Sequence, residues 1–265
     1  MHTHHLLPHF IANCHDRQLS KNTIDNYRHH LADRFDRPHL EPLEWAAEHA
    51  DGRRYAPSTV NLRLAILSAW HTWLVEIGET DSNPIHQLRR PKPGQPDPQP
   101  LSRHDIAAAM SQTDTTTRMM IALGCWAGLR QSEIAAIQHE HIDHSNRTVR
   151  VHRGKGGRSR VVPAASRLLE CHEVLARVGP FVFPGRYGGP VVRHTVQCRV
   201  IEAFARVGVV MNTHRMRASF ATHYYEESRD LLETSRLLGH ASPQTTLLYV
   251  RHVVSGHQHV DRLAG

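Results

Sequence analysis

Two basic side chains, His214 and Arg217, lie one helical turn apart. Asn212 or Thr213 can accept a hydrogen bond from a following backbone N–H, so either residue can cap a helix that begins here. Residues three apart share one face of a helix, and the first turn also presents free backbone N–H groups and the positive end of the helix dipole. This segment is therefore suited to bind a phosphate, although two surface polar residues of an ordinary helix would show the same spacing.

A second segment, GLRQSE at residues 128–133, combines an arginine with a carboxylate. The preceding residues 115–127 are largely apolar, which is typical of a buried helix, and Gly128 favours the end of that helix. Arg130 would follow directly, and Glu133 is near enough to hold its guanidinium by a charge-assisted hydrogen bond. An ordinary ion pair in a loop would show the same pattern.

A third segment, RGKGGR at residues 153–158, contains Lys155, one of only three lysines in the chain. Residues 148–152 alternate between apolar and polar side chains, and residues 159–162 are again typical of a strand. The glycines between them predict the turn of a β-hairpin. A lysine can give up its proton where an arginine cannot, so Lys155 at the tip is suited to be a general acid. The alternative is a lysine that only keeps the turn soluble.

The fourth segment ends at a tyrosine. Gly239 is suited to end one helix, and Ser242 followed by Pro243 favours the start of the next. Tyr249, one of six tyrosines, falls on that second helix nine residues after His240. A tyrosine hydroxyl is a nucleophile that can form a covalent intermediate. Considered alone, any of these tyrosines would more ordinarily serve as a core or surface residue.

All four segments lie within residues 101–265, where the sequence predicts mostly helices around one β-hairpin. Residues 91–100, PKPGQPDPQP, contain five prolines, which forbid a regular helix and favour an extended linker. Residues 1–90 are predicted to be all-helical, with helices starting after Ser20 and at Pro42. The predicted fold class is therefore mainly α with a small β-hairpin or sheet (α+β), in two domains.

The formal net charge of +7 indicates a polyanionic partner, with nucleic acid first. Arginine carries nearly all of the positive charge, and its planar fork suits phosphate, although a compositional bias of the genome would also produce the excess. The sequence contains no run of 18 apolar residues and no signal-peptide pattern at its start, so no membrane span is expected. The four cysteines form no CxxC pair and are expected to be reduced thiols in or near cores.

The order and spacing of the four segments resemble the tyrosine recombinase (phage integrase) family. Members of that family carry a G-L-R-x-S-E segment, a G-K-G-x-x-x-R-x-V-P hairpin, an H-x-x-R helix start, and an L-G-H segment followed nine residues later by the nucleophile. The matching positions are the catalytic candidates Arg130, Lys155, His214, Arg217, His240 and Tyr249, with Glu133 as a supporting residue. Departures from the pattern, such as Met216 for the usual leucine, remove no reacting group.

The resemblance covers residues 101–265 closely, as a catalytic tyrosine recombinase domain. Residues 1–90 are similar more loosely, through SKNTIDNYRHHL and STVNLRLAILSAW, to the helical core-type DNA-binding (SAM-like) domain of the family. Because the helical part begins almost at residue 1, the sequence predicts a simple integrase or Xer-like recombinase without an arm-binding domain.

The resemblance implies a site-specific DNA recombinase that works through a 3′-phosphotyrosyl intermediate. Tyr249 would attack the phosphorus, while Arg130 and Arg217 would hold the nonbridging oxygens. Lys155 would protonate the leaving 5′-oxygen, and His214 would assist proton transfer at the tyrosine or bind the phosphate.

The resemblance also assigns supporting roles and partners. His240 would donate to a nonbridging oxygen, and Glu133 would orient the active site. Guanidinium groups would take the place of Mg²⁺, so neither a cofactor nor a metal is expected, and the sequence has no HExxH or Cys/His zinc spacing. The expected partner is double-stranded DNA carrying core recombination sites, bound by a homotetramer in the cytoplasm of a bacterial host, in association with the nucleoid.

The expected biological role is integration or excision of a phage or mobile element. Two other functions remain open at this point. One is a type IB topoisomerase-like enzyme that nicks and closes DNA without exchanging partners. The other is a catalytically idle DNA-binding protein on the same fold.

Overall fold

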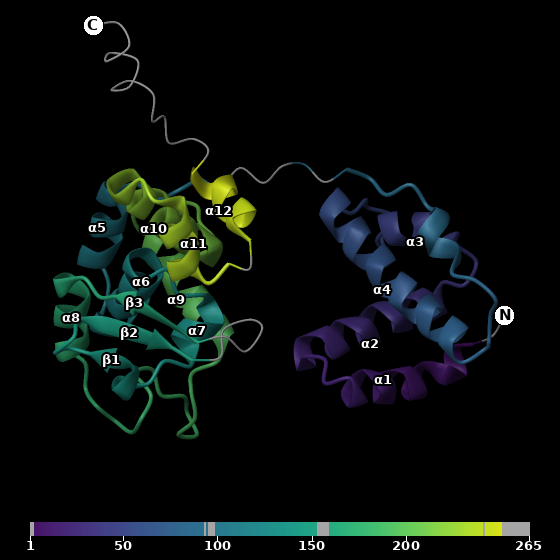
Figure 1. The fold of residues 1–265 in the computed structure, drawn as a ribbon, viewed down its shortest axis with the longest axis horizontal. Coiled ribbons are helices and arrows are strands. Elements are labelled where there is room, and N and C mark those ends of the chain that lie inside the picture. Colours follow the sequence, from purple (N-terminus) through teal and green to yellow (C-terminus); the bar gives the residue numbers. More distant parts are fainter. Residues whose placement is uncertain (1–2, 93, 95–98, 153–158, 241, 251–265) are drawn as a thin grey trace, which may run out of the picture. The chain divides into compact units, whose positions relative to one another are not determined.

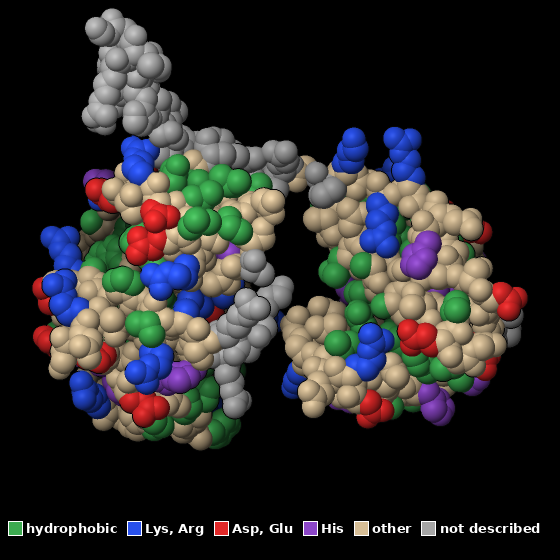
Figure 2. Space-filling model, in the orientation of Figure 1, with side chains coloured by type: hydrophobic (Ala, Val, Ile, Leu, Met, Phe, Trp, Pro, Cys, Tyr) green, Lys and Arg blue, Asp and Glu red, His purple; other side chains and the backbone are tan. Residues whose placement is uncertain are grey.

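The computed structural model describes residues 3–92, 94, 99–152, 159–240 and 242–250. The chain divides into two compact units, Met1–Gln95 and Pro96–Gly265 (Figure 1). On the face shown in Figure 2, Lys and Arg side chains are spread over each unit among acidic ones. None of the helices in the described part of the chain is both long and apolar enough to cross a membrane.

The smaller unit is helical, as predicted. Its helices are α1 (Leu7–Asp16), α2 (Lys21–Asp36), α3 (Pro42–Ala47) and α4 (Pro57–Glu76), with 3-10 turns at His4–Leu6 and Pro84–Gln87. The hydroxyl of Ser20 accepts a hydrogen bond from the backbone N–H of Thr23 at 3.2 Å, so the predicted cap of α2 is confirmed. Pro42 stands in the first turn of α3, also as predicted. Helix α1 was not predicted, although its buried residues Phe10, Ile11 and Cys14 are at helical spacing.

An ionic cluster lies within the core of this unit. Asp33 Oδ2 accepts hydrogen bonds from Arg37 (2.5 Å), from the indole N–H of Trp45 (2.9 Å) and from Arg63 (2.6 Å). The Arg63 guanidinium is buried and lies over the Trp45 ring, 4.1 Å from its centroid. One carboxylate oxygen therefore joins α2, α3 and α4.

The larger unit is α+β, as predicted. Its helices are α5 (Arg103–Ser111), α6 (Thr115–Trp126), α7 (Gln131–Ala135), α8 (Ser166–Glu173), α9 (Arg193–Ala205), α10 (Thr213–Ser228), α11 (Leu231–Leu238) and α12 (Pro243–Val250). The antiparallel sheet has the order β1 (Ile142–Asp143), β2 (Thr148–Val151), β3 (Arg160–Pro163). The two predicted strands are confirmed, and β1 adds a third. The hairpin tip with Lys155 lies outside the described residues.

Helix α6 lies at the centre of the larger unit and packs against α5, α8, α9 and α10. From Met119 to Cys125 it is apolar on all sides and buried, which is typical of a central helix. Gly128 follows it at φ +64°, and a Cβ there would lie 2.5 Å from the Phe220 ring. Only glycine combines this backbone conformation with so close an approach, which explains why α6 ends where the sequence predicts.

The four cysteines are free thiols. Cys14, Cys125 and Cys171 are buried, as expected, but Cys198 is exposed on α9. The expectation was wrong for Cys198 because position 198 falls on the solvent side of that helix.

Candidate active site

Helix ends in the larger unit bring six of the seven predicted site residues together. Arg130 precedes α7, whereas His214 and Arg217 lie near the start of α10. His240 follows the end of α11, and Tyr249 lies on α12. The sixth, Glu133, lies on α7, and the seventh, Lys155, lies outside the described residues. Positions that are far apart in the sequence thus meet around the carboxyl end of α11.

The Tyr249 hydroxyl contacts a histidine. Its Oη lies 2.5 Å from Nε2 of His214, and its ring centroid lies 5.8 Å from that of His240. The Thr222 hydroxyl donates to the backbone carbonyl of Tyr249 at 2.9 Å and so joins α10 to α12. Burial raises the pKa of Tyr249 against the opposing effect of Arg217 and Arg130. The phenol is therefore protonated at neutral pH and needs a base before it can attack.

His214 is placed to be that base. The side-chain oxygen of Asn212 accepts from the backbone N–H groups of His214 (3.1 Å) and Arg215 (3.2 Å), so Asn212 rather than Thr213 caps α10. Partial desolvation, and then the positive charges of Arg217 and Arg130, lower the pKa of His214, although the residue is still exposed to solvent. A neutral imidazole has one unprotonated ring nitrogen. When Nε2 is that nitrogen, it can accept the tyrosine proton.

Two arginines line the site beside the carboxyl end of α11. Arg217 is buried and donates through Nη1 to the carbonyl of Gly128 at 2.6 Å and through Nη2 to the carbonyl of Leu238. Arg130 donates through Nη2 to the carbonyl of Gly239 at 3.2 Å. Burial and the neighbouring arginines lower the pKa of Arg217 to about 9, which leaves it positively charged at neutral pH.

Glu133 binds Arg130 through two hydrogen bonds. Its carboxylate accepts from the Arg130 backbone N–H at 2.7 Å and from Nη1 of the same residue at 2.9 Å. Arg160 donates to both carboxylate oxygens at 2.9 and 2.8 Å. Burial alone would raise the pKa of Glu133, but the hydrogen bonds and charge of Arg160, followed by those of Arg130, lower it to about 2. The carboxylate is therefore ionised.

Two residues of this site were not predicted from the sequence. Arg160 was present as the arginine of the G-K-G-x-x-x-R-x-V-P hairpin, and that motif was the signal that could have identified it. Thr246 gave no sequence signal. Its buried hydroxyl lies 2.8 Å from Nδ1 of His240. Burial, then Arg217 and Arg130, lower the pKa of His240 to about 4, so this histidine is also neutral.

Three of the predicted site residues, Arg130, His214 and Arg217, line a pocket of about 330 Å³. Its wall consists of Leu129, Arg130, Gln131, Ser132, Arg193, Thr213, His214 and Arg217. The described residues contain no group of three or more His, Cys, Asp or Glu side chains suited to hold a metal ion. With two guanidinium groups and the start of α10 on its wall, the pocket is suited to an anionic phosphate.

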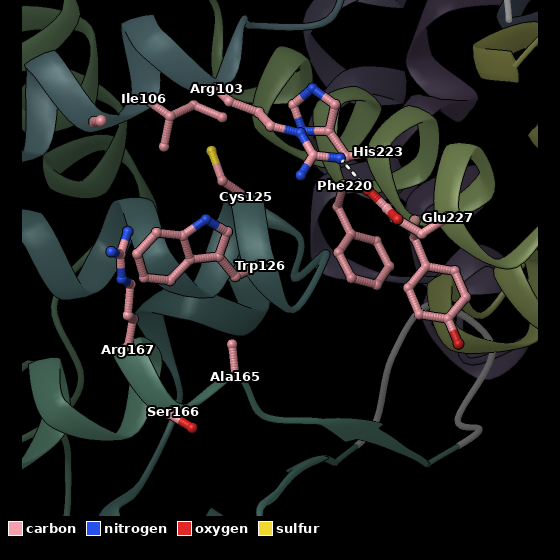
Figure 3. Close-up of a pocket in the computed structure, with 12 residues that line it drawn as sticks. Arg103, Ile106, Cys125, Trp126, Ala165, Ser166, Arg167, Phe220, His223 and Glu227 are labelled. Carbon is pink, nitrogen blue, oxygen red and sulfur yellow. Dashed lines mark hydrogen bonds and ion pairs between the residues drawn. The ribbon is translucent and has the colours of Figure 1, made fainter.

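A second pocket of about 480 Å³ lies among α5, α6, α10 and the start of α8 (Figure 3). Trp126 and Phe220 line it, and an ion pair of 2.7 Å between Arg103 and Glu227 crosses its edge. None of the predicted site residues lines this pocket, so it is separate from the tyrosine site.

This chain is similar to known proteins over most of its length. Residues 100–255 match the phage integrase family. The tyrosine recombinase XerC of Xylella fastidiosa (strain M23) is 34% identical over 92% of this chain and 91% of the relative. That of Xanthomonas campestris pv. campestris (strain B100) is 31% identical over 88% of this chain and 80% of the relative.

Solved structures show the same fold. A lambda integrase dimer bound to a COC′ core site has a TM-score of 0.73 at 18% identity, covering 93% of this chain and 76% of the other. The Tn1549 transposon integrase in complex with circular intermediate DNA has a TM-score of 0.72 at 18% identity, covering 99% of both chains. The chain therefore belongs to the phage integrase family, and it is a tyrosine-type site-specific recombinase.

Proposed function

We propose that this recombinase cleaves and rejoins DNA through a covalent bond between Tyr249 and a DNA 3′-phosphate. The observation that carries the proposal is the 2.5 Å contact between Tyr249 Oη and His214 Nε2, beside a pocket lined by Arg130 and Arg217. A nucleophile, a neutral base and two phosphate-binding cations thus occupy one site.

In the proposed cleavage step, Tyr249 Oη forms a bond to the scissile phosphorus and its proton passes to Nε2 of His214. The bond between phosphorus and the 5′-oxygen breaks, and Lys155 supplies a proton to that oxygen. Arg130 and Arg217 stabilise the charge that grows on the nonbridging oxygens. In the rejoining step, a 5′-hydroxyl from the partner duplex attacks the phosphotyrosine, so the energy of the broken bond is conserved and no nucleotide is consumed.

His240 and Glu133 support these steps. If Nδ1 of His240 accepts from the Thr246 hydroxyl, with which it is in contact at 2.8 Å, then Nε2 carries the proton and can donate to a nonbridging oxygen. The ionised Glu133 keeps the Arg130 guanidinium in place by its 2.9 Å hydrogen bond.

The proposed domain roles follow the family. Residues 1–90 would bind core-site DNA, residues 91–100 would link the domains, and residues 101–265 would perform catalysis. We infer that the active assembly is a homotetramer on two double-stranded sites, working in the cytoplasm on nucleoid DNA. A lambda integrase tetramer bound to a Holliday junction, with a TM-score of 0.71 to this chain at 19% identity, supports that inference through its shared fold.

Integration or excision of a phage or mobile element is the proposed biological role, supported by the fold shared with the lambda and Tn1549 integrases. A second candidate is an XerC-like role at chromosomal sites, favoured by 34% identity to a curated XerC. Incubating the protein with a library of paired sites and sequencing the new junctions separates the two. Relaxation of supercoils without any new junction would instead indicate a topoisomerase-like enzyme.

A nicked suicide substrate carrying the identified site tests the chemistry. The wild type should form a covalent DNA adduct visible on a denaturing gel, and Tyr249→Phe should form none. Tyr225→Phe, which removes a hydroxyl from α10 outside the site, is the matched control and should form the adduct. Absence of an adduct with the wild type, or its presence with Tyr249→Phe, would refute the proposal.

A further inference from the structure

The carboxyl end of α11 accepts hydrogen bonds from three arginines through three successive carbonyls. The carbonyls of residues 237–239 accept, in this order, from Nε of Arg160 at 2.7 Å, from Nη2 of Arg217, and from Nη2 of Arg130 at 3.2 Å. The end of a helix carries partial negative charge, which favours cations there. This helix end therefore gathers three guanidinium groups from β3, from α10 and from the segment before α7.

Arg160 differs from the other two arginines. Its three side-chain nitrogens all donate to protein acceptors, one to the carbonyl of Leu237 and two to Glu133. Its side chain does not line the 330 Å³ pocket, whereas those of Arg130 and Arg217 do. Arg160 is therefore not placed to contact a phosphate in that pocket.

The contact from Arg160 to Arg130 runs through one carboxylate. Both Glu133 oxygens accept from Arg160, at 2.9 and 2.8 Å. The same two oxygens accept from the side chain and the backbone N–H of Arg130, at 2.9 and 2.7 Å. Two parallel bonds from a planar guanidinium fix the plane of a carboxylate, so Arg160 sets the orientation in which Glu133 holds Arg130.

The aliphatic part of the Arg160 side chain packs closely against Gly239. The φ of Gly239 is +63°, and a Cβ added there would lie 3.1 Å from Cδ of Arg160. The glycine therefore both ends α11 and leaves room for Arg160. Through this contact β3 packs against the segment that leads to His240.

We infer that Arg160 is a positioning residue that holds Arg130 in its phosphate-binding orientation through Glu133; this inference rests on the proposed function. Without Arg160, the Glu133 carboxylate would keep only the Arg130 contacts and could rotate toward that guanidinium. The Arg130 guanidinium would then no longer point at the nonbridging oxygen, although Arg130 and Tyr249 would both still be present.

Two substrates separate this role from general damage to the fold. One is the suicide substrate with a normal scissile phosphate. The other carries a methylphosphonate there, in which a methyl group replaces one nonbridging oxygen and removes its negative charge. Arg160→Met should lower the rate of adduct formation on the phosphate substrate on the order of 100-fold at saturating DNA. On the methylphosphonate the deficit should fall to about tenfold or less, because less charge needs stabilisation.

The ratio of the two rates does not depend on the fraction of folded enzyme, so misfolding would lower both rates equally. Arg206→Met is the matched control, because Arg206 is half exposed and forms a surface ion pair of 2.6 Å with Glu202 on α9. It should change neither rate by more than about twofold. Arg160→Lys keeps the positive charge but loses the planar guanidinium. On the phosphate substrate it should therefore be faster than Arg160→Met but slower than the wild type.

A double-mutant cycle tests the route through Glu133. Glu133→Gln and Arg160→Met should each slow the phosphate substrate, and the double variant should be little slower than the slower single variant. Three results would overturn the inference. They are a double variant whose deficit is the product of the two single deficits, equal deficits of Arg160→Met on the two substrates, or a wild-type rate for Arg160→Met. If the wild type forms no adduct with the phosphate substrate, the proposed function itself fails, which is a distinct result.

Discussion

The phenol of Tyr249 and Nε2 of His214 lie 2.5 Å apart, although 35 residues separate them in the chain. Burial raises the pKa of Tyr249 and lowers that of His214. The resting pair is therefore a neutral phenol beside a neutral imidazole. This is the protonation state that the proposed transfer of the tyrosine proton to the histidine requires.

The rate of adduct formation should consequently depend on pH through His214. It should rise with pH through the lowered pKa of His214, because only the neutral imidazole accepts a proton. His214→Gln should reduce the rate on the order of 100- to 10,000-fold and remove this rise. Single-turnover rates from pH 5 to 9 measure the effect, and an unchanged acidic limb in His214→Gln would assign the titration to another group.

Replacing Gly239 by alanine should disturb both stability and activity. Its φ of +63° is unfavourable for alanine, and the new Cβ would press on Arg160. We expect a loss of about 1–2 kcal/mol in the free energy of unfolding from the backbone alone, together with slower cleavage. Urea unfolding and the suicide substrate measure the two effects.

Gly208 provides the control for that substitution. Its φ is +76°, but no atom lies within 4 Å of a Cβ added there. Gly208→Ala should therefore lose a similar amount of stability without slowing cleavage. If both alanine variants cleave at the same rate, the contact between Gly239 and Arg160 has no part in catalysis.

The larger unit should lose stability in mild acid because of His172. This side chain is 1% exposed, and its two ring nitrogens lie 2.8 Å from His139 and from His144. Burial, and then those two histidines, lower its pKa to about 4. Between the ordinary pKa of about 6.5 and this value, the unfolded chain binds one more proton than the folded chain, so stability falls as the pH falls.

The loss attributable to His172 is at most about 3 kcal/mol. Between pH 6.5 and 4, the unfolding free energy of His172→Gln should change less steeply with pH than that of the wild type. The difference in slope should correspond to close to one bound proton. His104→Gln, at a side chain that is 91% exposed, should leave the slope as in the wild type. An equal slope for wild type and His172→Gln would place the titration elsewhere.

The smaller unit should depend on the ion pair between Asp33 and Arg63. Arg63→Met leaves a partly buried carboxylate without one partner and should cost about 3–5 kcal/mol, measured by tryptophan fluorescence during urea unfolding. Arg53→Met, at a 78% exposed arginine paired with Asp51, should change stability by less than about 1 kcal/mol.

The contribution of Asp33 has a definite sign with pH. Burial alone would raise its pKa, but hydrogen bonds from Arg37 and Trp45 and the charge of Arg63 lower it. Its stabilisation is therefore complete above the unfolded pKa of about 3.9 and is lost as the pH falls through the lower folded pKa. A difference in stability between wild type and Asp33→Asn that grows as the pH falls below 4 would contradict this assignment.

Local structure around the site was predictable from the sequence, because caps and glycines act over a few residues. Asn212 was one of two predicted caps for α10, and the Asn212 side chain is the one that accepts the backbone N–H groups. Gly128 and Gly239 end their helices at positive φ, as their type and position predicted. The four motifs likewise predicted that one tyrosine, two arginines and two histidines belong to a common site, and these residues do lie together.

Only the tertiary structure decided which of these groups touch. Arg160 reaches the carbonyl of Leu237 across 77 residues of sequence, and Arg130 reaches that of Gly239 across 109. No periodicity or capping signal extends that far, because such contacts depend on how helices and strands pack into one core. The same packing buries Tyr249 and partly desolvates His214 and His240, and this desolvation is the largest cause of their shifted pKa values. The sequence by itself therefore determined which residue types could perform the chemistry, whereas the packing around the end of α11 determined their protonation states and orientation.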